Sequence, residues 1–116
     1  MHFKLIIIIS EDKRTQEVLQ AARDSGATGC TVLNQARGEG LSPIKTFLGL
    51  SINSQVDVIL LLAEEHLSRE IMEQVAAAGE FEKTPGSGIA FQLDVEDVIG
   101  IKNQIEALAE AVEDRI

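Results

Sequence analysis

The sequence predicts a mixed α+β domain, and three observations support this fold class. Residues 3–9 and 56–62 are almost continuous runs of β-branched and aliphatic residues, a pattern typical of strands inside a sheet. Other segments carry apolar residues at helical spacing and are followed by glycine. The chain has 116 residues, enough to bury a core without a metal or a disulfide. We therefore expect residues 1–116 to form a single domain.

The N-terminal half is expected to contain two strands around one helix. Residues 3–9 form the first strand. Ser10 can cap the helix that follows, because its side-chain oxygen can accept a hydrogen bond from an unpaired backbone N–H, and Gly26 can end that helix. Residues 28–35 are rich in threonine, valine and leucine and predict the second strand. Within that strand, Cys30 is expected to be a packed, small apolar side chain.

The C-terminal half is expected to contain two more strands and two helices. Residues 56–62 form the third strand. Residues 67–78 have an apolar stripe at helical spacing, and Gly79 lies just past the end of this predicted helix. Residues 89–93 form the fourth strand, and residues 103–116 form an amphipathic terminal helix with acidic residues on its outer face.

The predicted order, β-α-β-β-α-β followed by a helix, is that of the ferredoxin-like folds. Such a fold sets one antiparallel four-stranded sheet against two helices. The other face of the sheet must be covered by the terminal helix or by neighbouring subunits. We expect oligomerisation to cover it.

Charge and composition exclude several classes of partner. The net charge is −9, and the chain has no clustered basic stripe of the kind that binds nucleic acid or anionic lipid. One cysteine cannot form an intrachain disulfide, which fits a reducing compartment, and we expect the protein in the cytoplasm. The apolar run at residues 5–9 is too short to span a membrane, and no signal-peptide cleavage pattern follows it.

Two glycine-bearing connections are the candidate functional segments. Residues 36–54 form a 19-residue connection with no convincing element of its own. Residues 79–88 form a shorter connection that contains Pro85-Gly86-Ser87-Gly88. Long connections in compact domains usually bind, gate or dock something, so we look for function in these two segments.

Four short motifs occur at residues 29–32 (GCTV), 37–40 (RGEG), 85–88 (PGSG) and 94–98 (DVEDV). Their order and spacing resemble the PII family of signal-transduction proteins over nearly the whole chain. The resemblance implies a ferredoxin-like homotrimer that binds an adenine nucleotide in the clefts between subunits. It also makes residues 36–54 the counterpart of the family's T-loop and residues 79–88 the counterpart of its B-loop.

The resemblance, together with nearby cations, implies a set of nucleotide-binding residues at the base of the long loop, at the end of the third strand and in the glycine loop. The set is Thr31, Arg37, Gly38, Gly40, Leu62, Ala63, Glu64, Gly86, Ser87, Gly88 and Lys102. Glycines suit this role because backbone N–H groups can approach an anion without an intervening Cβ. Gly86-Ser87-Gly88 also fits an ordinary turn before the fourth strand, and this alternative stays open.

The chain departs from the family at the positions that neutralise phosphate. Ile89 stands in place of the lysine that follows the second B-loop glycine, and Gly100 and Lys102 replace two arginines. Arg37, Lys83 and Lys102 compensate only in part, because they are scattered. The expected ligand is therefore ATP, ADP, AMP or a cyclic adenine nucleotide, and the sequence does not decide among them.

The long loop is unusually apolar. Exposed apolar residues usually mark an interaction surface, so we expect a protein partner to be bound by Leu41, Ile44, Phe47, Leu48 and Leu50. The resemblance implies that this partner is a membrane transporter. In the alternative, these side chains pack on the subunit itself or on its neighbour. Ser42 and Pro43 can begin a short helix, and Ser42 replaces the family's glutamine that helps to hold magnesium and 2-oxoglutarate, so we do not expect 2-oxoglutarate sensing. The chain has no tyrosine and cannot be uridylylated.

Two other functions compete with the nucleotide sensor. The first is a trimer that handles a divalent metal, as CutA and the metal-associated PII-like proteins do, with acids and His66 as ligands. The second is a weak nucleotide hydrolase in which Glu39 or Glu64 positions water, although no nucleophile–base pair supports it. We assign no catalytic residue and no metal ligand, and expect His2 and His66 to be structural or solvated.

Overall fold

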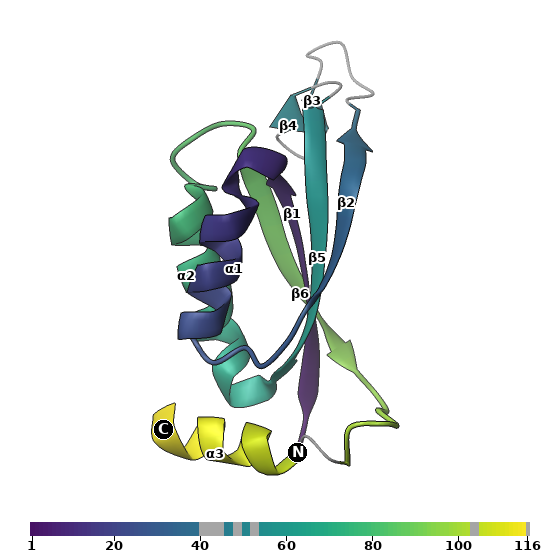
Figure 1. Cartoon of the computed structure of the whole chain (residues 1–116), viewed down its shortest axis with the longest axis vertical. Helices are drawn as coiled ribbons and strands as arrows, with labels where there is room; N and C mark the ends of the chain where they lie inside the picture. The colour runs from purple at the N-terminus through teal and green to yellow at the C-terminus, as the bar shows by residue number, and fades with distance from the viewer. Residues whose placement is uncertain (40–45, 48–49, 52–53, 103–104, 116) are drawn as a thin grey trace.

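The structure, a computed structural model, describes residues 1–39, 46–47, 50–51, 54–102 and 105–115. Two helices pack on one face of a four-stranded antiparallel sheet whose strand order is β2-β5-β1-β6 (Figure 1). The elements are β1 (Phe3–Glu11), a 3-10 helix (Asp12–Arg14), α1 (Thr15–Asp24), β2 (Thr31–Gly38), β3 (Thr46–Phe47), β4 (Leu50–Ser51), β5 (Ser54–Glu64), α2 (Glu65–Gly79), β6 (Gly88–Val95) and α3 (Ile105–Arg115). This topology confirms the predicted ferredoxin-like fold with a terminal helix.

The central strand β1 sets the register of the sheet. It pairs with β5 from Phe3 opposite Glu64 to Glu11 opposite Val56, and with β6 on its other side. Because side chains alternate along a strand, Ile6 and Ile8 point toward the helices and are fully buried. They pack with apolar side chains of the other core elements: Val18, Ala22, Ile59, Leu61, Ala63, Leu67, Ile71 and Val75.

The opposite face of the sheet is also apolar. Ile7 lies between Leu60 and Phe91, and the row below it places Leu5 between Leu62 and Leu93. Leu93 is 51% exposed, and both α1 and α2 lie on the other face (Figure 1). The α3 helix lies at the end of the sheet that holds the N-terminus (Figure 1). No helix in the described ranges is long and apolar enough to cross a membrane.

The first helix begins later than predicted. Ser10 does not cap it, because Ser10 and Glu11 remain paired with β5 and extend β1. The 3-10 helix at Asp12–Arg14 follows, and α1 starts only at Thr15, without a side-chain cap. The end of the helix is as expected, since Gly26 adopts a positive φ of 112° and its N–H donates to the carbonyl of Arg23.

The long connection is shorter than predicted and holds an element of its own. Antiparallel pairing continues to Gly38 opposite Ser54, so β2 and β5 extend into the predicted loop. The two-residue strands β3 and β4 pair with each other within the remaining connection. The predicted short helix at Ser42 and Pro43 lies outside the described residues.

The strand β2 contains a bulge. Its register with β5 shifts between Leu33 and Ala36, which lie opposite Val58 and Val56, so that β2 carries one extra residue there. Gln35 in the bulge has a φ of 61°, in the left-handed region. Cys30 lies just before β2 and is exposed, so its prediction as a packed strand residue was wrong.

The second helix begins at Glu65, two residues before the predicted start. Glu64 caps it, because its side chain accepts a hydrogen bond from the backbone N–H of His66. Ser68 lies in the first turn of the helix, and its Oγ donates to the Glu65 carbonyl. Glu80 ends the helix in the left-handed conformation, with a φ of 57°.

Candidate functional site

The two glycine segments lie at the same end of the sheet but on opposite edges. Gly38 is the last residue of β2, and Gly88 is the first residue of β6 (Figure 1). The strands β5 and β1 separate these two edges. The edge strands β2 and β6 are three strand spacings apart, or about 14 Å. Within one chain, the base of the long loop is therefore well separated from the glycine loop. Arg37, beside Gly38, is exposed, and its guanidinium pairs with Glu39 at 3.2 Å.

The predicted nucleotide-binding residues Thr31, Leu62 and Ala63 lie toward the other end of the sheet. Thr31 is opposite Leu60, and Leu62 is five residues along β5 from Asp57, which shares a row with Ser10 and Gly88. Five residues of strand span about 17 Å. Ala63 faces the core, and Leu62 lies on the apolar open face.

Of the two remaining positions of the predicted set, the structure describes Lys102 but not Gly40. Lys102 follows Ile101, which lines a pocket with Met1, Phe3 and Val95 at the far end of β6 from Gly88. Gly40 lies outside the described residues, as do Leu41, Ile44 and Leu48 of the predicted partner surface. Phe47 and Leu50, the other two, are paired with each other across β3 and β4.

Glu64 has a structural task. Its side chain is 3% exposed, and its two carboxylate oxygens contact the backbone nitrogen of His66 at 2.8 Å and the ring Nδ1 of His66 at 2.5 Å. Glu64, Glu65 and His66 are the group in the described ranges that could hold a metal ion. Capping already accounts for this cluster, and the positive end of a helix dipole disfavours a cation. The geometry therefore gives the metal-binding alternative little support.

The loop at residues 80–87, which joins α2 to β6, is organised around Glu80. The Glu80 carbonyl accepts hydrogen bonds from the backbone nitrogens of Lys83 and Thr84, at 3.1 and 2.8 Å, and from the Ser87 hydroxyl at 2.9 Å. Ser87 is completely buried. Its hydroxyl therefore holds the loop together, which agrees with the turn interpretation for this residue.

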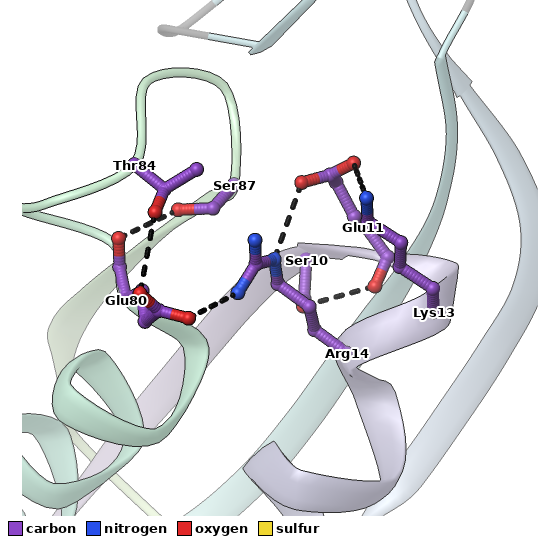
Figure 2. A network of polar contacts seen from close by, with 7 residues as sticks. All are labelled: Ser10, Glu11, Lys13, Arg14, Glu80, Thr84 and Ser87. Carbon is purple, nitrogen blue, oxygen red and sulfur yellow. Dashed lines mark hydrogen bonds and ion pairs between the residues drawn. The ribbon is translucent and has the colours of Figure 1, made fainter.

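The same loop is tied to the junction between β1 and α1 (Figure 2). The Glu11 backbone nitrogen donates to the Ser87 carbonyl at 3.0 Å. The Arg14 guanidinium donates from Nε to Glu11 at 3.3 Å and from a terminal nitrogen to Glu80 at 3.0 Å. The sequence analysis missed Arg14, because its partner Glu80 is 66 residues away and no local pattern connects them.

The Arg14–Glu80 contact is expected to weaken in acid, so that the free energy of unfolding falls as the pH falls. Its hydrogen bond, assisted by charge attraction, holds the pKa of Glu80 below the ordinary value of 4.5 and raises the pKa of Arg14. A carboxyl with a lowered folded-state pKa stabilises the fold above its unfolded pKa, and this contribution is lost as the pH falls through the folded value. We expect Glu80→Gln to lose less unfolding free energy than the wild type as the pH falls below 4.5, the ordinary pKa of this carboxyl. Urea unfolding across this range checks the prediction, which parallel curves for the two proteins would contradict.

The two loop glycines are required by the backbone and by packing. Gly86 has a φ of 79°, a backbone conformation that residues other than glycine rarely adopt. A Cβ on Gly88 would lie 2.7 Å from the carbonyl oxygen of Ile9 and 2.3 Å from the ring of Phe81. A pocket of about 520 Å³ lies beside Gly88, between α2 and β6, where Met72, Phe81 and Lys83 line it with other residues.

Comparisons with known proteins support this fold assignment. No curated protein matches the chain. Solved structures do match: the chain is 20% identical to the apo form of CPII, a nitrogen regulatory PII-like protein from Thiomonas intermedia K12, with a TM-score of 0.64 over 82% of this chain and 90% of that one. It is 20% identical to CPII bound to ADP, AMP and acetate, with a TM-score of 0.66 over 87% and 93% of the two chains. It is 19% identical to the B. subtilis GlnK–ATP complex, with a TM-score of 0.70 over 87% and 88%.

The match to a protein family covers most of the chain. The profile of the family "Nitrogen regulatory protein P-II" matches residues 3–105, from the first residue of β1 to the first residue of α3. The matched range includes both glycine segments and all four strands of the main sheet. The chain therefore belongs to the nitrogen regulatory protein P-II family.

Proposed function

We propose that the chain is a PII-like signalling protein that forms a homotrimer in the cytoplasm and binds an adenine nucleotide between subunits. The observation that carries this proposal is the placement of Gly38 and Gly88 at one end of the sheet but on opposite edges. Either segment alone is half of a phosphate cradle. A second copy of the chain can supply the other half.

The strand directions fit this assembly. Adjacent strands are all antiparallel, so β2 and β6 run in opposite directions and β2 ends where β6 begins. Around an axis roughly parallel to the strands, the β6 edge of one copy meets the β2 edge of the next. Gly86 to Gly88 of one copy then lie near Arg37 and Gly38 of its neighbour, and head-to-tail contacts of this kind close into rings.

The apolar open face of the sheet supports the same assembly. Phe91, Leu93 and Leu33 are large apolar side chains on that face, each at least about a third exposed. Contiguous exposed apolar surface on a small domain usually marks an interface. Sheets that face one another around a central axis bury this surface.

The ligand class follows from proteins of the same fold. CPII has been crystallised with ADP and AMP, and B. subtilis GlnK with ATP. Arg37, Lys83 and Lys102 are few cations for three phosphates, which favours a ligand with fewer phosphates than ATP. Both acids considered for hydrolysis are engaged, Glu39 with Arg37 and Glu64 with His66, so we propose a sensor and not an enzyme.

Signalling then follows from a shift between loop states. A nucleotide that prefers one state of the long loop changes the affinity for a partner, and about 1–3 kcal/mol of coupling is enough for a useful response. We propose that the partner is a membrane transporter at the inner face of the membrane. It would be contacted through Leu41, Ile44, Phe47, Leu48 and Leu50.

Native mass spectrometry with ATP, ADP, AMP and cyclic adenine nucleotides tests the proposal, because one spectrum reports both the number of copies and the number of ligands. We expect a trimer that takes up to one nucleotide per cleft. Leu93→Glu, which places a charge on the open face, is expected to give a folded monomer that binds no nucleotide. Nucleotide bound equally well by the Leu93→Glu monomer would show that the site is not between subunits. A trimer that takes up divalent metal and no nucleotide would favour the metal-handling alternative.

A further inference from the structure

The first and last residues of the loop at 80–87 are both held by the junction between β1 and α1: Arg14 contacts Glu80 (Figure 2), and the Glu11 backbone nitrogen donates to the Ser87 carbonyl. We infer that Arg14 is a positioning residue for this loop: it fixes Glu80, and through Glu80 it holds Gly86 to Gly88 in the conformation that receives the anionic part of the ligand. The inference rests on the proposed function. It assigns to Arg14 a role that requires no contact with the nucleotide.

Glu80 is the residue on which the loop conformation depends. Its carbonyl accepts three hydrogen bonds from within the loop, from Lys83, Thr84 and Ser87. Its backbone is in the left-handed region, which is unfavourable for a residue other than glycine unless the surroundings hold it there. The side chain supplies that hold, since its carboxylate contacts Arg14 at 3.0 Å and the Thr84 hydroxyl at 3.4 Å.

Arginine is suited to this position by its shape. Its planar guanidinium presents donors in a fixed fork, so that Nε reaches Glu11 while a terminal nitrogen reaches Glu80. The Arg14 side chain is 19% exposed, compared with 70% for Lys13, whose ammonium lies 3.8 Å from Glu11. The two neighbouring cations therefore differ: Arg14 bridges two elements, and Lys13 remains largely in solvent.

The contact with Glu80 reduces the cost of binding. A loop that is already held in its bound conformation loses less conformational freedom when the ligand arrives. The hydrogen bond from Glu11 to the Ser87 carbonyl fixes the other end of the loop. Without Arg14, the Glu80 end is released, and part of the binding free energy must then be spent on ordering the loop.

The test compares Arg14→Gln with Lys13→Gln, because both remove one positive charge from adjacent residues of the same 3-10 helix. We expect Arg14→Gln to speed hydrogen exchange at the backbone amides of Thr84 and Ser87 and to raise the Kd for ADP by roughly tenfold. Lys13→Gln should change neither. Arg14→Lys should recover part of the affinity, because lysine keeps the charge but lacks the fork.

A double-mutant cycle with Glu80→Gln tests whether the two residues act as a pair. If Arg14 acts through Glu80, the double variant should bind ADP no more weakly than the weaker of the two single variants. Losses that add in the double variant, or a raised Kd with unchanged exchange at Thr84 and Ser87, would mean that Arg14 contacts the nucleotide and would overturn the inference. If the wild type binds no adenine nucleotide, the proposed function fails, and the exchange experiment alone decides the inference. Unchanged exchange in both Arg14→Gln and Glu80→Gln would then overturn it.

Discussion

Replacing Gly88 with alanine is expected to lower the free energy of unfolding by about 3 kcal/mol, near the upper end of the usual cost of overpacking. The new Cβ would lie 2.7 Å from the carbonyl oxygen of Ile9. That oxygen belongs to the central strand β1, which is paired on both sides, and cannot move without disturbing the sheet. The ring of Phe81, at 2.3 Å, would also have to move.

Gly29→Ala is the matched control, because a Cβ at Gly29 meets nothing within 4 Å. Its stability should stay within about 0.5 kcal/mol of the wild type. Urea unfolding followed by circular dichroism measures both variants. Equal stability of the Gly88 and Gly29 variants would show that the contact with Ile9 relaxes easily. Until that is known, a loss of nucleotide binding in a Gly88 variant is no proof that Gly88 touches the ligand.

Replacing Asp57 with alanine is expected to destabilise the fold by about 3 kcal/mol, because the buried Thr15 hydroxyl and the backbone N–H of Gln35 would lose their acceptor. Asp57 is 7% exposed. One carboxylate oxygen accepts the Thr15 hydroxyl at 2.7 Å, and the other accepts the backbone N–H of Gln35 at 3.3 Å. The side chain thus joins the start of α1 to the bulge in β2.

Asp57→Asn should cost only about 1 kcal/mol, since the amide oxygen can still accept from Gln35 and the Thr15 hydroxyl can turn to accept from the amide nitrogen. Combining Asp57→Ala with Gln35→Gly refines the test. Glycine adopts a φ of 61° without help, so the cost of losing Asp57 should be smaller in the Gln35→Gly background. Urea denaturation of the four proteins gives the coupling, and an Asp57→Ala variant as stable as the wild type would refute the assigned role.

The strands and their order were predictable because each strand corresponds to a short, continuous run of β-branched and aliphatic residues in the sequence. The run at residues 56–62 has so many β-branched and aliphatic residues that only a strand inside a sheet suits it. Element boundaries were less predictable, because they depend on pairing with distant residues. Ser10 has the chemistry of a helix cap, but pairing with Asp57 and Gly88 keeps it in β1.

The site was predictable only as a set of segments. Glycines at residues 38, 86 and 88 identify the loops, but nothing local shows that these loops lie on opposite edges of the sheet. Glu64 belongs to the set implied by the resemblance, whereas in the structure one of its oxygens caps α2 and the other contacts the ring of His66. The sequence patterns around Arg14 and Asp57 indicate only a helix and a strand. The roles of these two side chains follow from contacts with residues that are distant in the sequence.

The bulge in β2 also protects an exposed edge of the sheet. An outer strand with a regular ladder offers a continuous row of backbone donors and acceptors that can recruit any extended chain and start aggregation. The extra residue between Leu33 and Ala36 interrupts that row and twists the strand locally. The β2 edge therefore presents two short pairing segments, which an arbitrary unfolded peptide cannot easily extend.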